Sequence, residues 1–323
     1  MKKTAVMLLV ACVAGCGGGG GGQKGPSFTP VSATKDGDLY TLQLGDLKIV
    51  VDGGRGARIT EFSLSGTNAL VIRDDSANYG STFWPSPQAS WCAGGTGCWP
   101  APAEIDTMAY TGAIDPTNSI RLVSGVASLG SVAGSSIFVS KDFVPVPEHG
   151  AVDVTYTLAN TSPSDPITLA PWQVTRVAAG GITYFGQGGG DVTYAPDSDP
   201  VFTVTAAGGD RWYSSATVNH DSKAFADGTG WVAQITTHAL FLVMSSPDIQ
   251  PAEAAPGEAE IELFTNRDYV YVEVEQQGAF VEIPPGQTGT WTVRWKLRPM
   301  PAGASYVPGS ADLVALANKV VAQ

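Results

Sequence analysis

From residue 39 onward, apolar and polar residues alternate in short runs that Gly, Pro, Asn and Asp interrupt. A period of two residues is typical of β-strands, and the period of 3.6 that marks an amphipathic helix is almost absent. Many strands without helices between them predict an all-β antiparallel sandwich or barrel. The clearest alternating runs cover residues 40–51, 136–146, 152–158, 201–206, 231–244, 269–283 and 291–297.

One helix is expected, at the carboxyl end of the chain. Ser310 stands where it can cap a helix, and the apolar residues that follow it recur on one face. These residues are Leu313, Leu316, Ala317, Val320 and Val321. No repeat and no linker rich in Pro and Ser divides the chain, so we predict one domain over residues 31–323.

The composition narrows the possible functions. The 323 residues include 18 Lys plus Arg against 30 Asp plus Glu, a net charge of −12, and 43% are hydrophobic against 15% charged. Such a chain forms a core and is not disordered. Because a phosphate-binding surface needs clustered Lys and Arg, nucleic acid is excluded as a partner. After the first 16 residues, no stretch is apolar and long enough to span a membrane.

The first sixteen residues resemble a bacterial lipoprotein signal. Lys2 and Lys3 precede a short apolar run over 5–13, and Val-Ala-Gly-Cys ends at Cys16. The resemblance implies cleavage before Cys16, whose thiol then carries lipid. An ordinary secretory signal, cut at a small residue, is the alternative.

This reading divides the amino-terminal part in two. Residues 1–15 are the signal peptide, and 16–30 hold the lipidated Cys and a flexible Gly-rich tether. Gly17 stands where inner-membrane lipoproteins usually carry Asp, so the resemblance favours the outer membrane of a bacterial cell envelope. We expect a monomer that touches the membrane through its lipid alone.

Two further cysteines, Cys92 and Cys98, lie between Trp91 and Trp99 with flexible Gly residues between them. In an exported protein, two such cysteines are expected to form a disulfide. A metal site is the alternative, but two thiols without a neighbouring His make only half of a zinc site. We therefore expect no metal and no cofactor.

The most informative strand covers residues 269–275. Alternation places Tyr269, Tyr271, Glu273 and Glu275 on one face, and Val270, Val272 and Val274 on the core face. Aromatic rings stack on the C–H faces of sugars, and carboxylates accept bonds from sugar hydroxyls, so the first face is a candidate saccharide site. An ordinary exposed strand face would show the same pattern.

Two aromatic segments could complete such a site. Trp84 lies in a polar, proline-containing segment that continues to Gln88, Trp91 and Trp99, and it could form an aromatic platform or close one end of the sandwich. In the second segment, Trp172 and Arg176 share one strand face and Gln173 and Thr175 the other. Arg176 could bind sugar oxygens or form a structural ion pair.

Three weaker signals favour ordinary structure. Residues 53–58 lack the helix that a phosphate loop needs and are expected to form a turn between strands. Asp191, Asp197 and Asp199 fit no calcium loop and are expected in a solvated turn. The histidines are His149 in a turn, His220 in a loop and His238 in a strand, and they define no catalytic triad.

Taken in order, these segments resemble the galactose mutarotase-like (aldose 1-epimerase-like) superfamily. The resemblance rests on the 53–55 turn, the 83–88 segment, the Asn160 to Arg176 segment and the Glu273/Glu275 strand that ends in 284–286. It implies a large twisted antiparallel β-sandwich, the supersandwich, with a sugar site on its concave face.

The resemblance also suggests catalytic roles. Glu275 lies where aldose mutarotases carry their general base, and Glu273 is the second candidate. The two segments where the family's paired histidines would lie contain Trp84 to Gln88 and Trp172 to Thr175, and neither has a His. Gln donates no proton at neutral pH as an imidazolium does, so the usual acid–base pair is missing.

Three functions therefore stay open. The first is a surface-tethered lipoprotein that binds a saccharide without chemistry, and the second is a carbohydrate-active enzyme that uses Glu275 as base. The third is a structural envelope protein whose concave face meets another protein. The sequence does not decide whether His220 or His238 enters the site.

Overall fold

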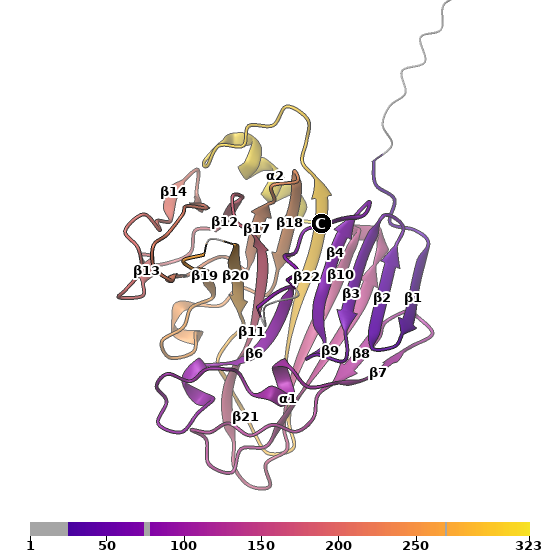
Figure 1. Cartoon of the computed structure of the whole chain (residues 1–323), viewed down its shortest axis with the longest axis vertical. Coiled ribbons are helices and arrows are strands. Elements are labelled where there is room, and N and C mark those ends of the chain that lie inside the picture. The colour runs from indigo at the N-terminus through magenta and orange to yellow at the C-terminus, as the bar shows by residue number, and fades with distance from the viewer. Residues whose placement is uncertain (1–24, 74–77, 269) are drawn as a thin grey trace, which may run out of the picture.

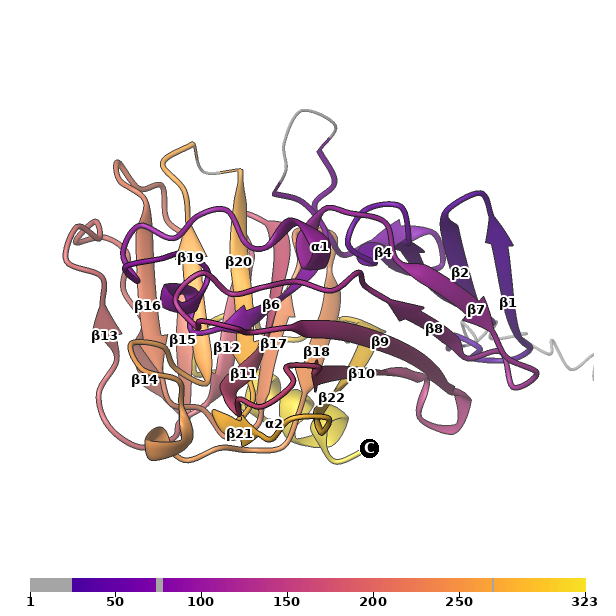
Figure 2. The same ribbon diagram turned by 90° about the horizontal axis from the view of Figure 1, so that it is seen from below.

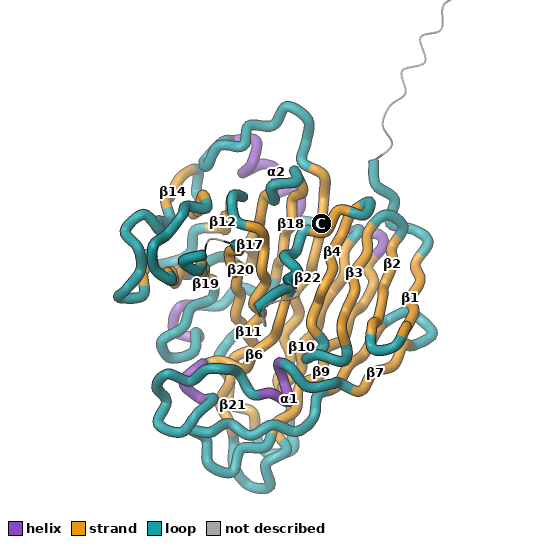
Figure 3. Tube along the Cα trace, in the orientation of Figure 1, coloured by secondary structure: helices purple, strands orange, loops and turns teal. Residues whose placement is uncertain are grey.

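The computed structural model describes residues 25–73, 78–268 and 270–323, and it is mostly β (Figure 1, Figure 3). Two antiparallel sheets pack face to face, with a short helix at the carboxyl end. This confirms the predicted antiparallel sandwich and its terminal helix. No helix in the described part of the chain has the length and apolar character needed to cross a bilayer.

Within the described residues, the larger sheet has 12 strands in the order β1-β2-β3-β4-β6-β11-β20-β19-β16-β13, with β5 paired to β4 and β21 to β11. Its strands are β1 (Val31–Asp36), β2 (Leu39–Leu44), β3 (Leu47–Asp52), β4 (Arg58–Leu64), β5 (Thr67–Asn68), β6 (Ser81–Ser86), β11 (Ile167–Ala178), β13 (Thr193–Tyr194), β16 (Ser222–Ala226), β19 (Ile261–Thr265), β20 (Tyr271–Gln277) and β21 (Val281–Ile283). Sequence neighbours pair at the β1 to β4 end, whereas β6, β11 and β20 come together from distant parts of the chain.

The smaller sheet, in the part of the chain that the structure describes, has 10 strands in the order β14-β15-β12-β17-β18-β22-β10-β9-β8-β7. Its strands are β7 (Thr111–Ile114), β8 (Ile120–Val123), β9 (Ile137–Val146), β10 (Ala151–Asn160), β12 (Ile182–Gly186), β14 (Thr205–Ala207), β15 (Asp210–Ser214), β17 (Trp231–Ile235), β18 (Leu240–Ser245) and β22 (Thr288–Pro299).

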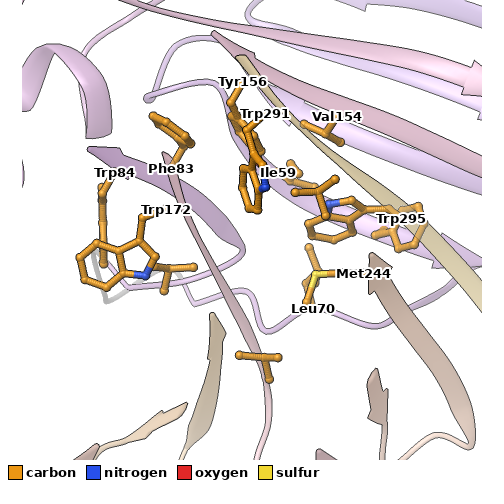
Figure 4. Close-up of a cluster of buried hydrophobic side chains, with 14 of the residues drawn as sticks. Ile59, Leu70, Phe83, Trp84, Val154, Tyr156, Trp172, Met244, Trp291 and Trp295 are labelled. Atoms are coloured by element: carbon orange, nitrogen blue, oxygen red, sulfur yellow. The ribbon is translucent and has the colours of Figure 1, made fainter. Parts of the chain in front are cut away.

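The main core lies between the sheets (Figure 4). Trp295 of the smaller sheet packs edge-on against Phe62 of the larger sheet, with ring centroids 5.2 Å apart. Gln173 of β11 also points into this core, where its Oε1 accepts hydrogen bonds from Tyr156 Oη at 2.9 Å and Trp295 Nε1 at 3.0 Å. Because strand residues alternate, Trp172 and Arg176 must then lie on the opposite face of the larger sheet.

The helix α2 (Ala311–Val321) buries Leu313, Ala317 and Val320 against the smaller sheet. Ser310 occupies the N-cap position, but its hydroxyl bonds Ser305 O instead of a helix N–H. At the other end, the Lys296 ammonium donates to Val320 O at 2.6 Å. A helix the sequence did not predict, the single turn α1 (Ala103–Asp106), lies between β6 and β7.

Several strand predictions needed correction at turns. The runs 40–51 and 231–244 are each a pair of strands, because Gly45 and the 236–239 turn reverse the chain. His238 therefore lies in an exposed turn and not in a strand. In the run 201–206, only the last two residues belong to a strand. The segment 53–58 is the predicted turn, between β3 and β4.

Candidate functional site

A cavity of about 400 Å³ lies on the face of the larger sheet that is directed away from the core; we call this face the cavity face. Ligand sites in proteins are typically of this size or larger. The segment between β6 and β7, in purple, crosses this face (Figure 2). The cavity is lined by Asn78, Trp84, Gln88, Trp99, Trp172, Asp221, Lys223, Phe264, Asn266, Arg267, Asp268, Tyr271 and Glu273.

Strand register brings the polar side chains of the cavity face into rows. Arg176 of β11 lies opposite Glu273 of β20, which in turn lies opposite Phe264 of β19. Phe264 lies opposite Lys223 of β16. These four residues come from four neighbouring strands, and each strand turns the same face to the cavity because side chains alternate along it.

Four tryptophans form the wall beside this row. Trp84 and Trp172 are register partners in β6 and β11, and their ring centroids lie 5.2 Å apart (Figure 4). Trp91 lies behind them, 5.6 Å from Trp84 and 6.0 Å from Trp172, and Trp99 lies 5.3 Å from Trp84. Trp99 is 51% exposed whereas the other three are buried, so it forms the open rim of the wall.

Trp99 follows a short loop that a disulfide closes. Cys92 and Cys98 form the predicted disulfide, with their Cα atoms 5.2 Å apart. Gln88 holds the same loop, because its side-chain Nε2 donates to Cys98 O at 2.8 Å. The backbone N–H of Gln88 also donates to Glu258 Oε1 at 3.0 Å, which ties the loop to the segment before β19.

An ammonium shared by two carboxyl groups forms the floor of the cavity. Lys223 Nζ lies 2.5 Å from Glu262 Oε2 and 3.3 Å from Glu275 Oε2. Glu275 Oε2 also accepts a hydrogen bond from Trp172 Nε1 at 2.8 Å. The ammonium lies 4.7 Å from the centroid of the Trp172 ring, a cation–π distance. The Lys223 side chain keeps 20% of its surface exposed, while both carboxyl groups are enclosed.

This arrangement shifts the acidity of all three groups. Burial raises the pKa of Glu262 to about 7 and of Glu275 to about 8, against the opposing attraction of Lys223. Burial by itself lowers the pKa of Lys223, but the nearby Glu262 and Glu275 carboxylates outweigh it and raise this pKa. The single ammonium of Lys223 neutralises only one of the two carboxylates. Near neutral pH the Lys223 group, by which we mean Lys223, Glu262 and Glu275, therefore retains a proton shared by the two carboxyl groups.

A second ion pair lies on the same face. Arg176 Nε donates to Glu273 Oε1 at 2.8 Å, and its Nη1 donates to Thr82 Oγ1 at 3.2 Å. The guanidinium also lies 5.3 Å from the centroid of the Trp84 ring. Burial raises the pKa of the neighbouring Tyr271 to about 12, so its hydroxyl stays protonated and able to donate. Arg176 therefore orients Glu273, whose carboxylate is left at the cavity edge.

The structure brings five of the predicted site residues to the cavity lining, namely Trp84, Gln88, Trp172, Tyr271 and Glu273. Five others are near or behind it: Trp91, Arg176 and Glu275 support the lining from within, and Gln173 and Thr175 point into the core, where they contact Met244. Tyr269 and Cys16 lie outside the described residues. Val270 is 37% exposed and precedes β20, so it is not the core residue that we expected.

None of the three histidines, all of which are described, lines the cavity. His149 ends a short 3-10 turn, and His220 and His238 are exposed in loops. No imidazole therefore lines the cavity among the described residues, which answers the question that the sequence left open for His220 and His238.

Sequence reasoning missed Lys223 and Glu262. Both lie in short strands, Ser222–Ala226 and Ile261–Thr265, that we did not single out. A signal was present, because Glu258, Glu260, Glu262 and Phe264 alternate with apolar or small residues. That pattern could have indicated a second acidic strand face, but not its pairing with Lys223.

The two sheets and the cavity on the larger one define a β-sandwich with the galactose mutarotase-like fold. The chain is similar to a galactose mutarotase-like protein from Clostridium acetobutylicum, with a TM-score of 0.52 and 10% identity over 84% of this chain and 99% of that one. A galactose mutarotase related enzyme from Lactobacillus acidophilus gives a TM-score of 0.53 at 8% identity, over 83% and 99% of the two chains.

A TPR-domain containing protein from Parabacteroides distasonis gives a TM-score of 0.55 at 11% identity, and the match covers 84% of this chain and 49% of that one. At such low sequence identities, the similarity of these structures to the chain shows a shared fold alone. No protein-family model and no curated protein sequence matches the chain.

Proposed function

We propose that this protein binds a carbohydrate in the cavity on the larger sheet, without chemical conversion, as a lipid-anchored protein of a bacterial envelope. One observation carries the proposal: an aromatic wall of Trp84, Trp99 and Trp172 lines the same cavity of about 400 Å³ as the hydrogen-bonding groups of Lys223 and Glu273. Indole rings suit the C–H faces of a sugar, and charged groups suit its hydroxyls.

Two features favour binding over catalysis by Glu275. Its carboxyl group is enclosed behind Trp172 and does not line the cavity, so it has no direct path to a sugar hydroxyl. Its pKa of about 8 also keeps it largely protonated at neutral pH, whereas a general base must be ionised. Glu273 lines the cavity, but its Oε1 already accepts a bond from Arg176.

The envelope location is a proposal from the sequence. It rests on the Val-Ala-Gly-Cys run that ends at Cys16 and on the glycines that follow. A purely structural envelope protein would use the same anchor, but it would have no need of a cavity walled by indole rings.

Calorimetry of the mature protein with a panel of neutral mono- and oligosaccharides tests binding. We expect at least one to bind, and Trp99→Ala to weaken it by roughly 1 to 2 kcal/mol because a stacking surface is lost. Tyr306→Ala is the matched control, since Tyr306 is 46% exposed and does not line the cavity. A panel without any binding sugar, or equal losses in both variants, would contradict the proposal.

A further inference from the structure

Each cationic side chain at the cavity contacts a carboxyl group of the protein itself. Lys223 contacts Glu262 and Glu275, and Arg176 contacts Glu273. The third cation, Arg267, lies 3.6 Å from Asp221 through its Nε, and its backbone N–H donates to the same carboxylate. A site built for a phosphate or a carboxylate instead presents Arg or Lys donors to the ligand.

The charges around the cavity add up to an excess of carboxyl groups. Among the described residues that line the cavity or pair with its lining, Lys223, Arg176 and Arg267 face Asp221, Glu262, Asp268, Glu273 and Glu275. Three cations thus stand against five carboxyl groups. The retained proton of the Lys223 group reduces this excess without reversing it, so the cavity has a negative potential.

An uncharged sugar suits this environment. The Lys223 ammonium has three donor hydrogens, and its partial exposure leaves room for a ligand oxygen beside its two carboxyl partners. A sugar hydroxyl can accept from Lys223 and donate to a carboxylate, so it needs no charge of its own. A uronate or a phosphate would instead approach the carboxyl groups of Asp221, Glu273 and Asp268, which lie at the cavity edge.

We propose that Lys223, held by Glu262 and Glu275, is the central ligand-binding donor of this cavity, and that the surrounding carboxyl groups select uncharged saccharides over uronates and sugar phosphates. The proposal rests on the proposed function and adds the substrate class to it. It predicts that the protein distinguishes sugars by their charge. Salt and a charge variant can test this separately from the shape of the cavity.

The test uses calorimetry at pH 7 with glucose, galactose and mannose, each compared with its uronate and its 6-phosphate. We expect a neutral sugar to bind and its two anionic counterparts to bind about tenfold more weakly or worse at low salt. The difference should shrink at high salt, because ions screen the field of the cavity.

A charge variant separates electrostatics from fit. Asp268→Lys changes an exposed residue of the cavity lining and should raise uronate binding relative to the neutral sugar by several fold. Asp36→Lys, the same change at an exposed residue of β1, should leave the ratio as it was.

The possible failures are distinct. If none of these sugars binds and no member of the neutral mono- and oligosaccharide panel binds either, the proposed function is overturned and this inference with it. If only another panel sugar binds, the comparison is made between that sugar and its uronate. If an anionic sugar binds as tightly as its neutral counterpart, or if neither salt nor Asp268→Lys changes the ratio, the charge selection is overturned while carbohydrate binding stands.

Discussion

At the scale of single residues, the stability of the candidate site depends on the buried ion pairs that Lys223 forms with Glu262 and Glu275. The Lys223 ammonium and the Glu262 and Glu275 carboxyl groups come from three adjacent strands and depend on one another. Removal of one partner from a buried ion pair leaves an uncompensated charge, whereas replacement of all partners costs far less.

Lys223→Met should therefore destabilise the protein by about 3 to 5 kcal/mol, and adding Glu262→Gln and Glu275→Gln to it should restore part of that loss. Urea unfolding measures both. Lys48→Met is the control, because Lys48 forms an exposed ion pair with Glu61 at 2.8 Å, and such pairs contribute at most about 1 kcal/mol. A triple variant no more stable than Lys223→Met would speak against the shared group.

The same carboxyl groups predict a pH dependence. In the folded state their pKa values lie near 7 and 8, above the ordinary value of 4.5. Their contribution to stability is therefore fully present below about pH 4.5 and is lost as the pH rises through 7 to 8.

Other buried groups titrate in this range, so the comparison is made with Glu262→Gln/Glu275→Gln. The stability of the wild-type protein relative to this variant should fall between pH 5 and pH 9, measured as the urea midpoint at each pH. A relative stability that rises with pH would refute the raised pKa values.

At the scale of elements, α2 is attached to the smaller sheet by buried polar contacts as well as by its apolar face. Lys296 donates to Val320 O at 2.6 Å, where the negative end of the helix dipole favours a cation. Tyr184 Oη donates to Leu313 O at 2.9 Å in the first turn. Both ends of the helix are thus held to strands of the smaller sheet.

Lys296→Met should loosen this attachment and cost about 1 to 3 kcal/mol, because it removes a charged hydrogen bond to Val320 O, whose other bond, from the Gln323 N–H, is long at 3.4 Å. Amide hydrogen exchange over α2 should accelerate accordingly. Lys319→Met, at an exposed position of the same helix, should change stability by no more than about 0.5 kcal/mol. Equal exchange rates in the two variants would rule out the role of Lys296.

At the scale of the whole molecule, the proposed lipid at Cys16 would attach the protein to the membrane through the predicted 16–30 tether. One lipid-modified residue would then decide where the protein is found in the cell.

Expression of the full chain in a bacterial host with labelled palmitate tests this anchor. We expect the wild-type protein in the membrane fraction and labelled, and Cys16→Ala soluble and unlabelled. Cys12→Ala should behave as the wild type, since Cys12 leaves with the signal peptide. Label retained by Cys16→Ala would place the lipid elsewhere or exclude it.

The sequence alone determined the class of fold, the disulfide and the polarity of one strand, because these depend on local pattern. The period of two residues indicates strands wherever they lie, and Cys92 and Cys98 are close in the chain. Alternation alone separates Glu273 from Val272 and Val274. The exact turns were less clear, since Gly45 interrupts an alternating run, 40–51, that we predicted as one segment.

The tertiary structure decided which strands are neighbours and which residues a ligand can reach. Lys223, Glu262 and Glu275 meet only because β16, β19 and β20 pair in one register, and no local signal specifies such distant pairing. Likewise, alternation separates Trp172 from Gln173, but only the packing of the second sheet shows that Gln173 faces the core. Glu275 has the right strand face and is nevertheless enclosed, because the neighbouring Trp172 covers its carboxyl group.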